Sequence, residues 1–344
     1  MSHSTVTKTY FKPLALPDNG FAMDDWWVWC GSVVRGPEGR FHLFASRWPK
    51  TLPFHPAWLT SSEIVRAEAE TVEGPYMFTD VVFPARGAEY WDGRSTHNPC
   101  IREYEGRYYL FYMGSTHPFG DPEPGQPLSM QDPRVIVGRS NKRIGLAVAD
   151  HPAGPWIRLD DPVLSTTPGT WRSFLVSNPT VWIEDDGSVL MIFKSRRYVG
   201  NKHSDMMLGV ARAPNIEGPY TVISPDPIFG PGINGVVEDP CLWKEAGTYH
   251  LLVKDMHGHL TGQEGAIAHA TSPDGLAWKL ADPAVAFYRE LRYPDGSINP
   301  VAHVERPSLY LDEEGRPTHL LAAVAEGDHH FQGLRRTWNQ IFRL

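Results

Sequence analysis

The sequence predicts an all-β fold, a five-bladed β-propeller with four-stranded blades around a central funnel. Two coupled signatures that recur in the same order along the 344 residues predict it. In most copies of the first signature, a residue with a carboxylate or amide side chain precedes a proline, and apolar residues follow. A glycine turn then leads into a β-rich run, which is typical of two strands joined by a hairpin. The clearest copy is Glu238-Asp239-Pro240-Cys241, with its turn at Gly247. Such regular copies are the mark of a repeat architecture.

Both signatures occur in most of the predicted blades. The other copies of the first are His97-Asn98-Pro99, Ser177-Asn178-Pro179, Glu305-Arg306-Pro307 and, with glycine in place of proline, Trp29-Cys30-Gly31. The second is an apolar run, a glycine turn and an aromatic residue, as in Gly74-Pro75-Tyr76, Gly154-Pro155-Trp156, Gly218-Pro219-Tyr220 and 275–278. We interpret it as a third strand, a turn and a fourth strand that ends in the aromatic residue. The shared order favours a propeller over unrelated hairpins in a sandwich.

The spacing of the copies divides one domain, residues 1–344, into five blades. The predicted blades are 21–90, 91–160, 161–224, 225–285 and 286–344. Residues 1–20 precede the first copy, and in a closed propeller such a segment supplies a strand to the last blade. Residues 61–73 are rich in Glu and Ala, but their place in the repeat predicts a strand and overrides helix propensity.

Two surface features follow from local composition. The Pro- and Gly-rich segment between Met113 and Arg134 predicts a long loop that walls a pocket or meets another subunit, leaving a homo-oligomer open. The basic residues Arg139, Lys142 and Arg143 that follow it predict a solvated rim.

Composition excludes several classes of partner. A net charge of −8 argues against nucleic acid, which requires a basic face. No apolar run is long enough to span a membrane, and residues 1–7 show no apolar signal-peptide region, so we expect a cytoplasmic protein, with a periplasmic or secreted one not excluded. Cys30, Cys100 and Cys241 occupy equivalent first-strand positions and predict buried small apolar residues, with no disulfide framework or metal site.

Acidic side chains stand where the innermost strands converge on the axis. The fourth and fifth copies offer Glu238, Asp239 and Glu305, and Asp24 and Asp25 lie just before the first copy. Carboxylates in a tryptophan-lined pocket suit glycoside cleavage, in which one acid protonates the leaving oxygen and another carboxylate activates water or attacks the sugar. The predicted substrate-binding residues are Trp26, Trp27 and Trp91 for stacking, and His97, Asn98, Asn178 and Asp255 for hydroxyl groups.

On these motifs the chain resembles the five-bladed propeller glycoside hydrolases of families 43, 32, 68 and 117. The resemblance covers nearly the whole chain as architecture but only short motifs as sequence. It implies that Asp239, in an Asp-Pro on an innermost strand, is a catalytic or transition-state-stabilising carboxylate. It also implies that Glu305 in Glu-Arg-Pro is the general acid and Arg306 a substrate clamp. Cys30-Gly31 replaces the Asp-Pro that supplies the family's base, so Asp24 or Asp25 is the predicted base.

The predicted function is an exo-acting, inverting glycosidase that cleaves a small or terminal sugar, with a role in polysaccharide degradation. Because neighbours on a strand point to opposite faces, only one of Glu238 and Asp239 can face the pocket, and either Glu238 or Glu305 is the acid. No cofactor or catalytic metal is expected, and the sequence leaves room for a structural cation on the axis.

Two alternatives remain. The first is a phosphorylase resembling family 130, with phosphate bound by basic residues at the ends of second strands: Arg47, Lys194, Arg196, Arg197 and Lys254. The second is a non-catalytic sugar-binding propeller, which would lack two carboxylates at a catalytic separation.

Overall fold

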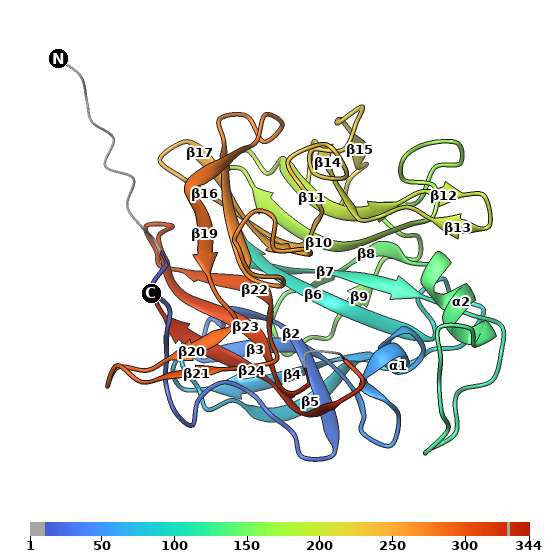
Figure 1. Ribbon diagram of the computed structural model, residues 1–344, viewed down its shortest axis with the longest axis horizontal. Helices are drawn as coiled ribbons and strands as arrows, with labels where there is room; N and C mark the ends of the chain where they lie inside the picture. Colours follow the sequence, from blue (N-terminus) through green and yellow to red (C-terminus); the bar gives the residue numbers. More distant parts are fainter. Residues whose placement is uncertain (1–10, 329–330) are drawn as a thin grey trace.

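The computed structural model describes residues 11–328 and 331–344, and it contains five four-stranded antiparallel sheets around a central axis (Figure 1). This confirms the predicted five-bladed propeller. Blades 1 and 2 consist of β2 (Trp26–Arg35), β3 (Phe41–Pro49), β4 (Glu63–Ala69), β5 (Met77–Phe83), β6 (Ser95–Tyr104), β7 (Arg107–Ser115), β8 (Arg143–Ala149) and β9 (Ile157–Arg158). The first strand of each blade is the innermost.

Blades 3 to 5 repeat this order. Their strands are β10 (Leu175–Ile183), β11 (Val189–Arg196), β14 (Met207–Ala213), β15 (Thr221–Val222), β16 (Val237–Glu245), β17 (Thr248–Asp255), β18 (Ile267–Ser272), β19 (Lys279–Phe287), β22 (His303–Leu311), β23 (Pro317–Gly327) and β24 (Leu334–Arg343). Two short ribbons are inserted, formed by β12 (Tyr198–Val199) with β13 (Lys202–His203) and by β20 (Glu290–Arg292) with β21 (Ile298–Pro300).

The N-terminal segment closes the ring. Strand β1 (Leu14–Ala15) pairs with β24 as the fourth strand of blade 5, with Ala15 opposite Phe342. Ala15 is fully buried, and Phe11 packs edge-on against Trp243 of blade 4 at 6.0 Å. The predicted contribution of residues 1–20 to the last blade is therefore confirmed for 14–15, and residues 1–10 lie outside the described part of the chain.

The core lies between neighbouring blades. In β7, Tyr108, Leu110 and Tyr112 pack toward blade 1, whereas Tyr109 and Phe111 pack toward blade 3. Side chains alternate between the two faces of a strand, and in a propeller both faces are covered by other sheets. This explains why the second strands read as continuous apolar runs without polar alternation.

The Gly-Pro-aromatic turns differ from the sequence prediction in one respect. The fourth strand starts after the aromatic residue, since Tyr76, Trp156 and Tyr220 come just before β5, β9 and β15. Each of these side chains turns back to a carbonyl four residues earlier, as in the bond from Tyr76 Oη to Val72 O at 2.9 Å. The aromatic residue thus anchors the turn.

Two helices, α1 (Phe54–Ser61) and α2 (Pro133–Ser140), contact each other in the β3–β4 and β7–β8 connections (Figure 1). Neither helix was predicted from the sequence, although α2 carries a helix-start signal: Asp132 caps it by accepting the Arg134 N–H at 2.9 Å, and Pro133 occupies the first position. Neither of these eight-residue helices has the length of a membrane span. The strand predicted within 61–73 is confirmed as β4.

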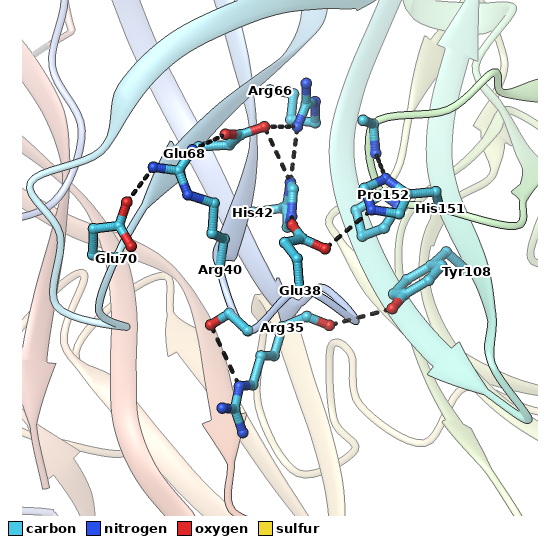
Figure 2. Close-up of polar contacts among 12 residues, drawn as sticks. Arg35, Glu38, Arg40, His42, Arg66, Glu68, Glu70, Tyr108, His151 and Pro152 are labelled. Atoms are coloured by element: carbon cyan, nitrogen blue, oxygen red, sulfur yellow. Dashed lines mark hydrogen bonds and ion pairs between the residues drawn. The ribbon is translucent and has the colours of Figure 1, made fainter.

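A polar network joins blades 1 and 2 at the β2–β3 turn (Figure 2). This turn lies at the opposite end of β2 and β3 from the connection that contains α1. The fully buried His42 lies between Glu38, at 2.6 Å from Nε2, and Arg66, at 2.8 Å from Nδ1. Burial lowers the pKa of His42 despite Glu38, so the ring stays neutral and accepts the Arg66 bond. Glu38 also reaches His151 of blade 2 at 3.0 Å, which links the two blades.

Candidate active site

Each innermost strand has an irregularity at the same place. The residue before proline, or before Gly31 in blade 1, has a left-handed backbone, and the strand pairing shifts there. The five residues, with their φ values, are Cys30 (48°), Asn98 (56°), Asn178 (52°), Asp239 (58°) and Arg306 (57°). Such φ values are uncommon outside glycine, so their recurrence in all five blades indicates a built feature of the fold.

The five side chains meet on the propeller axis, and we call them the axial ring. The Cys30 thiol donates to Asn98 Oδ1 at 3.2 Å, Asn98 Nδ2 donates to Asn178 Oδ1 at 2.6 Å, and Asn178 Nδ2 donates to Asp239 Oδ1 at 2.8 Å. Arg306 Nη1 completes the series with an ion pair to the same Asp239 oxygen at 2.5 Å. Asn98, Asn178 and Asp239 thus hold one another and line a small axial hollow of about 50 Å³.

The structure confirms that the three cysteines are free and buried. Burial raises the pKa of Cys30 to about 12 even though Arg306 opposes the shift, and it raises the pKa of Cys241 to about 12 as well. We therefore expect no reaction of the native protein with a disulfide reagent near neutral pH, and reaction of three thiols per chain after unfolding, measured by released thionitrobenzoate. A thiol that reacts in the native protein would contradict this burial.

Next to the axial ring lies a larger pocket of about 160 Å³, here called the funnel pocket. In four of the five blades, the residue just before the axial-ring position lines the floor of the funnel pocket. These residues are Trp29, His97, Glu238 and Glu305. The loops at this end of all five blades supply the walls: Phe54, His55, Trp58, Met130, Arg139, Lys142, Met206, Met256 and Phe331. Met130 belongs to the Pro- and Gly-rich loop. This loop therefore lines a pocket, which was one of its two predicted roles.

Two glutamates face each other across a lysine in this pocket. Lys254 Nζ lies 3.3 Å from Glu238 Oε1 and 2.5 Å from Glu305 Oε1. Lys194 Nζ contacts the second oxygen of Glu238 at 2.9 Å, and His303 Nδ1 contacts Glu305 at 2.9 Å. One carboxylate oxygen of Glu238 lies within 4.8 Å of one of Glu305.

The lysines keep both glutamates ionised. Burial by itself would raise the pKa of Glu305, but Lys254 and His303 hold it down to about 2. Glu238 is held well below its usual pKa by Lys194 and Lys254, again against the effect of burial. For Asp239 burial prevails over Arg306 and raises the pKa to about 6.

The two carboxylates that precede the first copy of the repeat lie outside the funnel pocket. Asp24 and Asp25 are exposed in the turn that leads into β2, and neither lines the funnel pocket. The catalytic role of these two residues stays a prediction that the geometry does not favour. Of the adjacent tryptophans, Trp26 packs under the Arg47 guanidinium at 3.9 Å, and Trp27 is buried with Nε1 bonded to Leu52 O at 2.9 Å.

Two further predicted sugar contacts have structural partners instead. Trp91 stacks on Tyr112 with ring centroids 5.8 Å apart, inside blade 2. Asp255 accepts backbone N–H groups of the loop after β17, including those of Gly258 and Thr261, both at 3.0 Å. The aromatic residues that line the pocket but were not predicted as sugar contacts are Trp29, Trp48, Phe54, Trp58 and Phe331. A signal existed only for Trp29, which precedes the axial-ring position in its blade.

The basic residues divide into two groups. Arg139 and Lys142 line the funnel pocket, and Lys142 is only 3% exposed, so the prediction of a solvated rim is wrong for both. The α2 segment folds them inward instead of leaving them on the surface. Among the basic residues predicted for phosphate, Lys194, Arg196 and Lys254 line the pocket. Arg47 pairs with Glu63 and Arg197 is exposed, so neither reaches it.

Glu238, Asp239 and Glu305 each offer an oxygen within 4.8 Å of the others, which suits a cation by distance alone. Lys194, Lys254 and Arg306 already form ion pairs with these three carboxylates. Their negative charge is therefore balanced by side chains, and a structural cation on the axis stays a prediction.

The propeller has the fold of known glycoside hydrolases of families 43 and 117. A family 117 glycoside hydrolase from Zobellia galactanivorans superimposes with a TM-score of 0.65 at 16% identity, over 97% of this chain and 89% of that chain. A family 43 β-xylosidase/α-arabinofuranosidase from a compost microbial metagenome, in complex with xylotriose and calcium-free, gives 0.59 at 16% identity, over 96% and 95%. A further glycoside hydrolase gives 0.66 at 14%, over 97% and 90%.

No protein-family model and no curated protein sequence matches the chain. At this level of identity the similarity establishes the fold alone.

Proposed function

We propose that the protein is a glycoside hydrolase that removes a terminal sugar in the funnel pocket, with Glu238 and Glu305 as the reacting carboxylates. The observation that carries the proposal is their convergence from adjacent blades to within 4.8 Å in an aromatic-walled cavity. A non-catalytic sugar-binding propeller has no need of two buried carboxylates at this separation. Buried ion pairs carry a desolvation cost that their attraction often does not repay, so their presence favours a chemical role.

The size of the pocket supports exo action. Its volume of about 160 Å³ is close to that of an engineered cavity of about 150 Å³ that binds benzene. One six-membered ring fits such a space, so the rest of the substrate lies outside. Trp29, Trp58 and Phe331 line the pocket and supply apolar surface against which a sugar ring can pack.

Because one oxygen of Glu238 lies within 4.8 Å of one oxygen of Glu305, the proposed pair is closer to the spacing of retaining enzymes than to that of inverting ones. Retaining glycosidases hold their carboxyl groups about 5–5.5 Å apart, whereas inverting enzymes need about 6.5–9.5 Å to admit water. Glu238, held ionised by two lysines, attacks the anomeric carbon while Glu305 gives a proton to the leaving oxygen. Water then cleaves the glycosyl–enzyme bond, with Glu305 taking back a proton. Inversion, as predicted from the sequence, would require a base such as Asp24 or Asp25.

The acid role requires Glu305 to gain a proton when the sugar binds, because its pKa in the free protein is about 2. A sugar ring over the pair removes water and leaves two like charges within 4.8 Å, and both effects raise the pKa of one carboxyl group. Lys254 can then pair with Glu238 alone.

The test is a screen of aryl and natural glycosides with and without phosphate, with the anomer of the first product followed by NMR. We expect phosphate-independent turnover and a product of the same anomeric configuration as the substrate. Inverted product would overturn the proposed pairing of Glu238 with Glu305. Turnover only with phosphate would show a phosphorylase, and sugar binding without turnover of any glycoside would show a binding module.

A further inference from the structure

The funnel pocket is strongly basic although the whole chain is acidic. Only two acidic side chains, Glu238 and Glu305, line it among the described residues. The basic side chains that line it are Arg139, Lys142, Lys194, Arg196, Lys254 and Arg306. A neutral sugar makes no demand for such an excess of positive charge.

Half of these cations are balanced within the site. Lys194 and Lys254 form ion pairs with the two glutamates, and Arg306 pairs with Asp239 of the axial ring. No described carboxylate lies within ion-pair distance of the other three, Arg139, Lys142 and Arg196. The excess charge therefore comes from these three side chains, which we call the cationic wall.

Lys142 is the central observation. Its side chain is almost fully buried, with the ammonium 4.2 Å from the centre of the Trp58 ring. A buried lysine without a counter-ion is unfavourable, and here burial together with Lys194 and Arg139 lowers its pKa well below the usual value. An anion at this point would satisfy the ammonium and restore its charge.

The other two members have the matching arrangement. Arg196 lies at the end of β11. Its Nη1 donates hydrogen bonds to His203 Nδ1 at 2.9 Å and to Ser204 O at 2.6 Å, so its guanidinium is held in place. Arg139 projects from the last turn of α2, and burial together with Arg196 lowers its pKa to about 10. Planar guanidinium groups bind oxyanions through paired N–H donors.

The pocket is also polarised across its width. The cationic wall comes from blades 2 and 3, whereas Glu238 and Glu305 come from blades 4 and 5. A ligand that spans the pocket can therefore place an oxyanion on one side and the bond to be cleaved on the other.

We propose that Arg139, Lys142 and Arg196 form an oxyanion subsite, which binds a carboxylate, sulfate or phosphate group together with the sugar ring. This deepens the proposed function and rests on it for the catalytic part. The oxyanion has two sources, a charged substituent on the sugar itself or inorganic phosphate beside a neutral sugar. Both place the same chemistry against the same three side chains.

The test is calorimetric binding at low salt, because it does not depend on turnover. The probes are glucuronate and galacturonate, their neutral counterparts glucose and galactose, inorganic phosphate alone, and each neutral sugar with phosphate. We expect at least tenfold tighter binding of one uronate than of its neutral counterpart if the sugar carries the charge. If phosphate supplies it, phosphate binds alone and tightens neutral-sugar binding at least tenfold.

Three variants assign the effect. Lys142→Met and Arg139→Gln are each expected to reduce the ratio of anion affinity to neutral-sugar affinity at least tenfold. Lys142→Met should also raise the melting temperature, because it replaces a buried amine that has no carboxylate partner among the described residues with an apolar side chain. Arg143→Gln is the matched control, since Arg143 is half-buried nearby but donates to the carbonyls of Ser140 and Lys142.

The outcomes separate the two proposals. Equal binding of charged and neutral sugars, no effect of phosphate, or an anion preference that survives in both variants would overturn the oxyanion subsite. If neutral glycosides are turned over under those conditions, the hydrolase proposal stands alone. Anion binding lost in the variants but without turnover of any charged or neutral glycoside would support the subsite and overturn the hydrolase.

Discussion

The Glu305→Gln variant is expected to lose turnover by about 10²–10⁴-fold, the usual contribution of a positioned general acid–base group. Glutamine keeps the size of the side chain but cannot transfer the proton to the leaving oxygen. Glu238→Gln should lose at least as much, since it removes the attacking oxygen of the proposed mechanism. Initial rates on the best glycoside of the screen, with unfolding midpoints measured alongside, give the comparison.

Glu38→Gln is the matched control for this pair. Glu38 is also a glutamate held by hydrogen bonds to side chains, but it lies at the β2–β3 turn, at the opposite end of blade 1, so its replacement should leave turnover unchanged. Asp24→Asn and Asp25→Asn complete the set. If either abolishes turnover while Glu238→Gln does not, the base comes from the exposed turn, and the proposed nucleophile is wrong.

The Lys254→Met variant is expected to lose about 3–5 kcal/mol of stability at neutral pH, the usual cost of removing one partner of a buried ion pair. Lys254 is the common partner of Glu238 and Glu305, and all three side chains are nearly inaccessible. Without the lysine, burial and mutual repulsion raise the pKa values of both glutamates. Chemical unfolding at neutral and at acidic pH measures the effect.

The loss should depend on pH in a defined direction. In the native protein the pKa of Glu305 is lowered from 4.5 to about 2, so its stabilising contribution is complete above pH 4.5 and disappears as pH falls through 2. In the variant the glutamates favour protonation, and acid relieves the repulsion. The stability difference should therefore be largest at neutral pH and shrink below pH 4.5, and a difference that grows in acid would contradict the ion-pair arrangement.

Lys244→Met is the control for this second prediction. Lys244 pairs with Glu184 at 2.8 Å, but the two side chains are 27% and 23% exposed. Such a pair contributes less than about 1 kcal/mol, so the variant should unfold close to the native protein.

The architecture follows from the sequence because each blade repeats the same local physics. A single sequence shows the signals of each blade: a proline after a polar residue, a glycine turn, and apolar runs. These signals predicted the five blades and the N-terminal strand that closes the ring. Glu238 and Glu305 were found for the same reason, since equivalent positions in a repeat converge on one axis.

The sequence could not say which neighbour of each pair faces the pocket. Glu238 and Asp239 point opposite ways, and the left-handed backbone at Asp239 turns that side chain into the axial ring. The resemblance favoured Asp239, whereas the funnel pocket contains Glu238. Lys142 was missed for a different reason: it follows a helix in a long connection, where no repeat position or hydrophobic period indicates the direction of a side chain.

The pairing of β1 with β24 has a consequence for the synthesis and folding of the protein on the ribosome. Strand β1 is synthesised early and stays unpaired until its partner β24 has left the ribosomal exit tunnel. Blades 1 to 4 consist of strands that follow one another in the chain, whereas blade 5, which carries Glu305, is complete only when β24 has emerged and paired with β1. A nascent chain can thus hold Glu238 in a complete blade while the blade of Glu305 is still incomplete, and the funnel pocket is fully formed only after β24 has paired with β1.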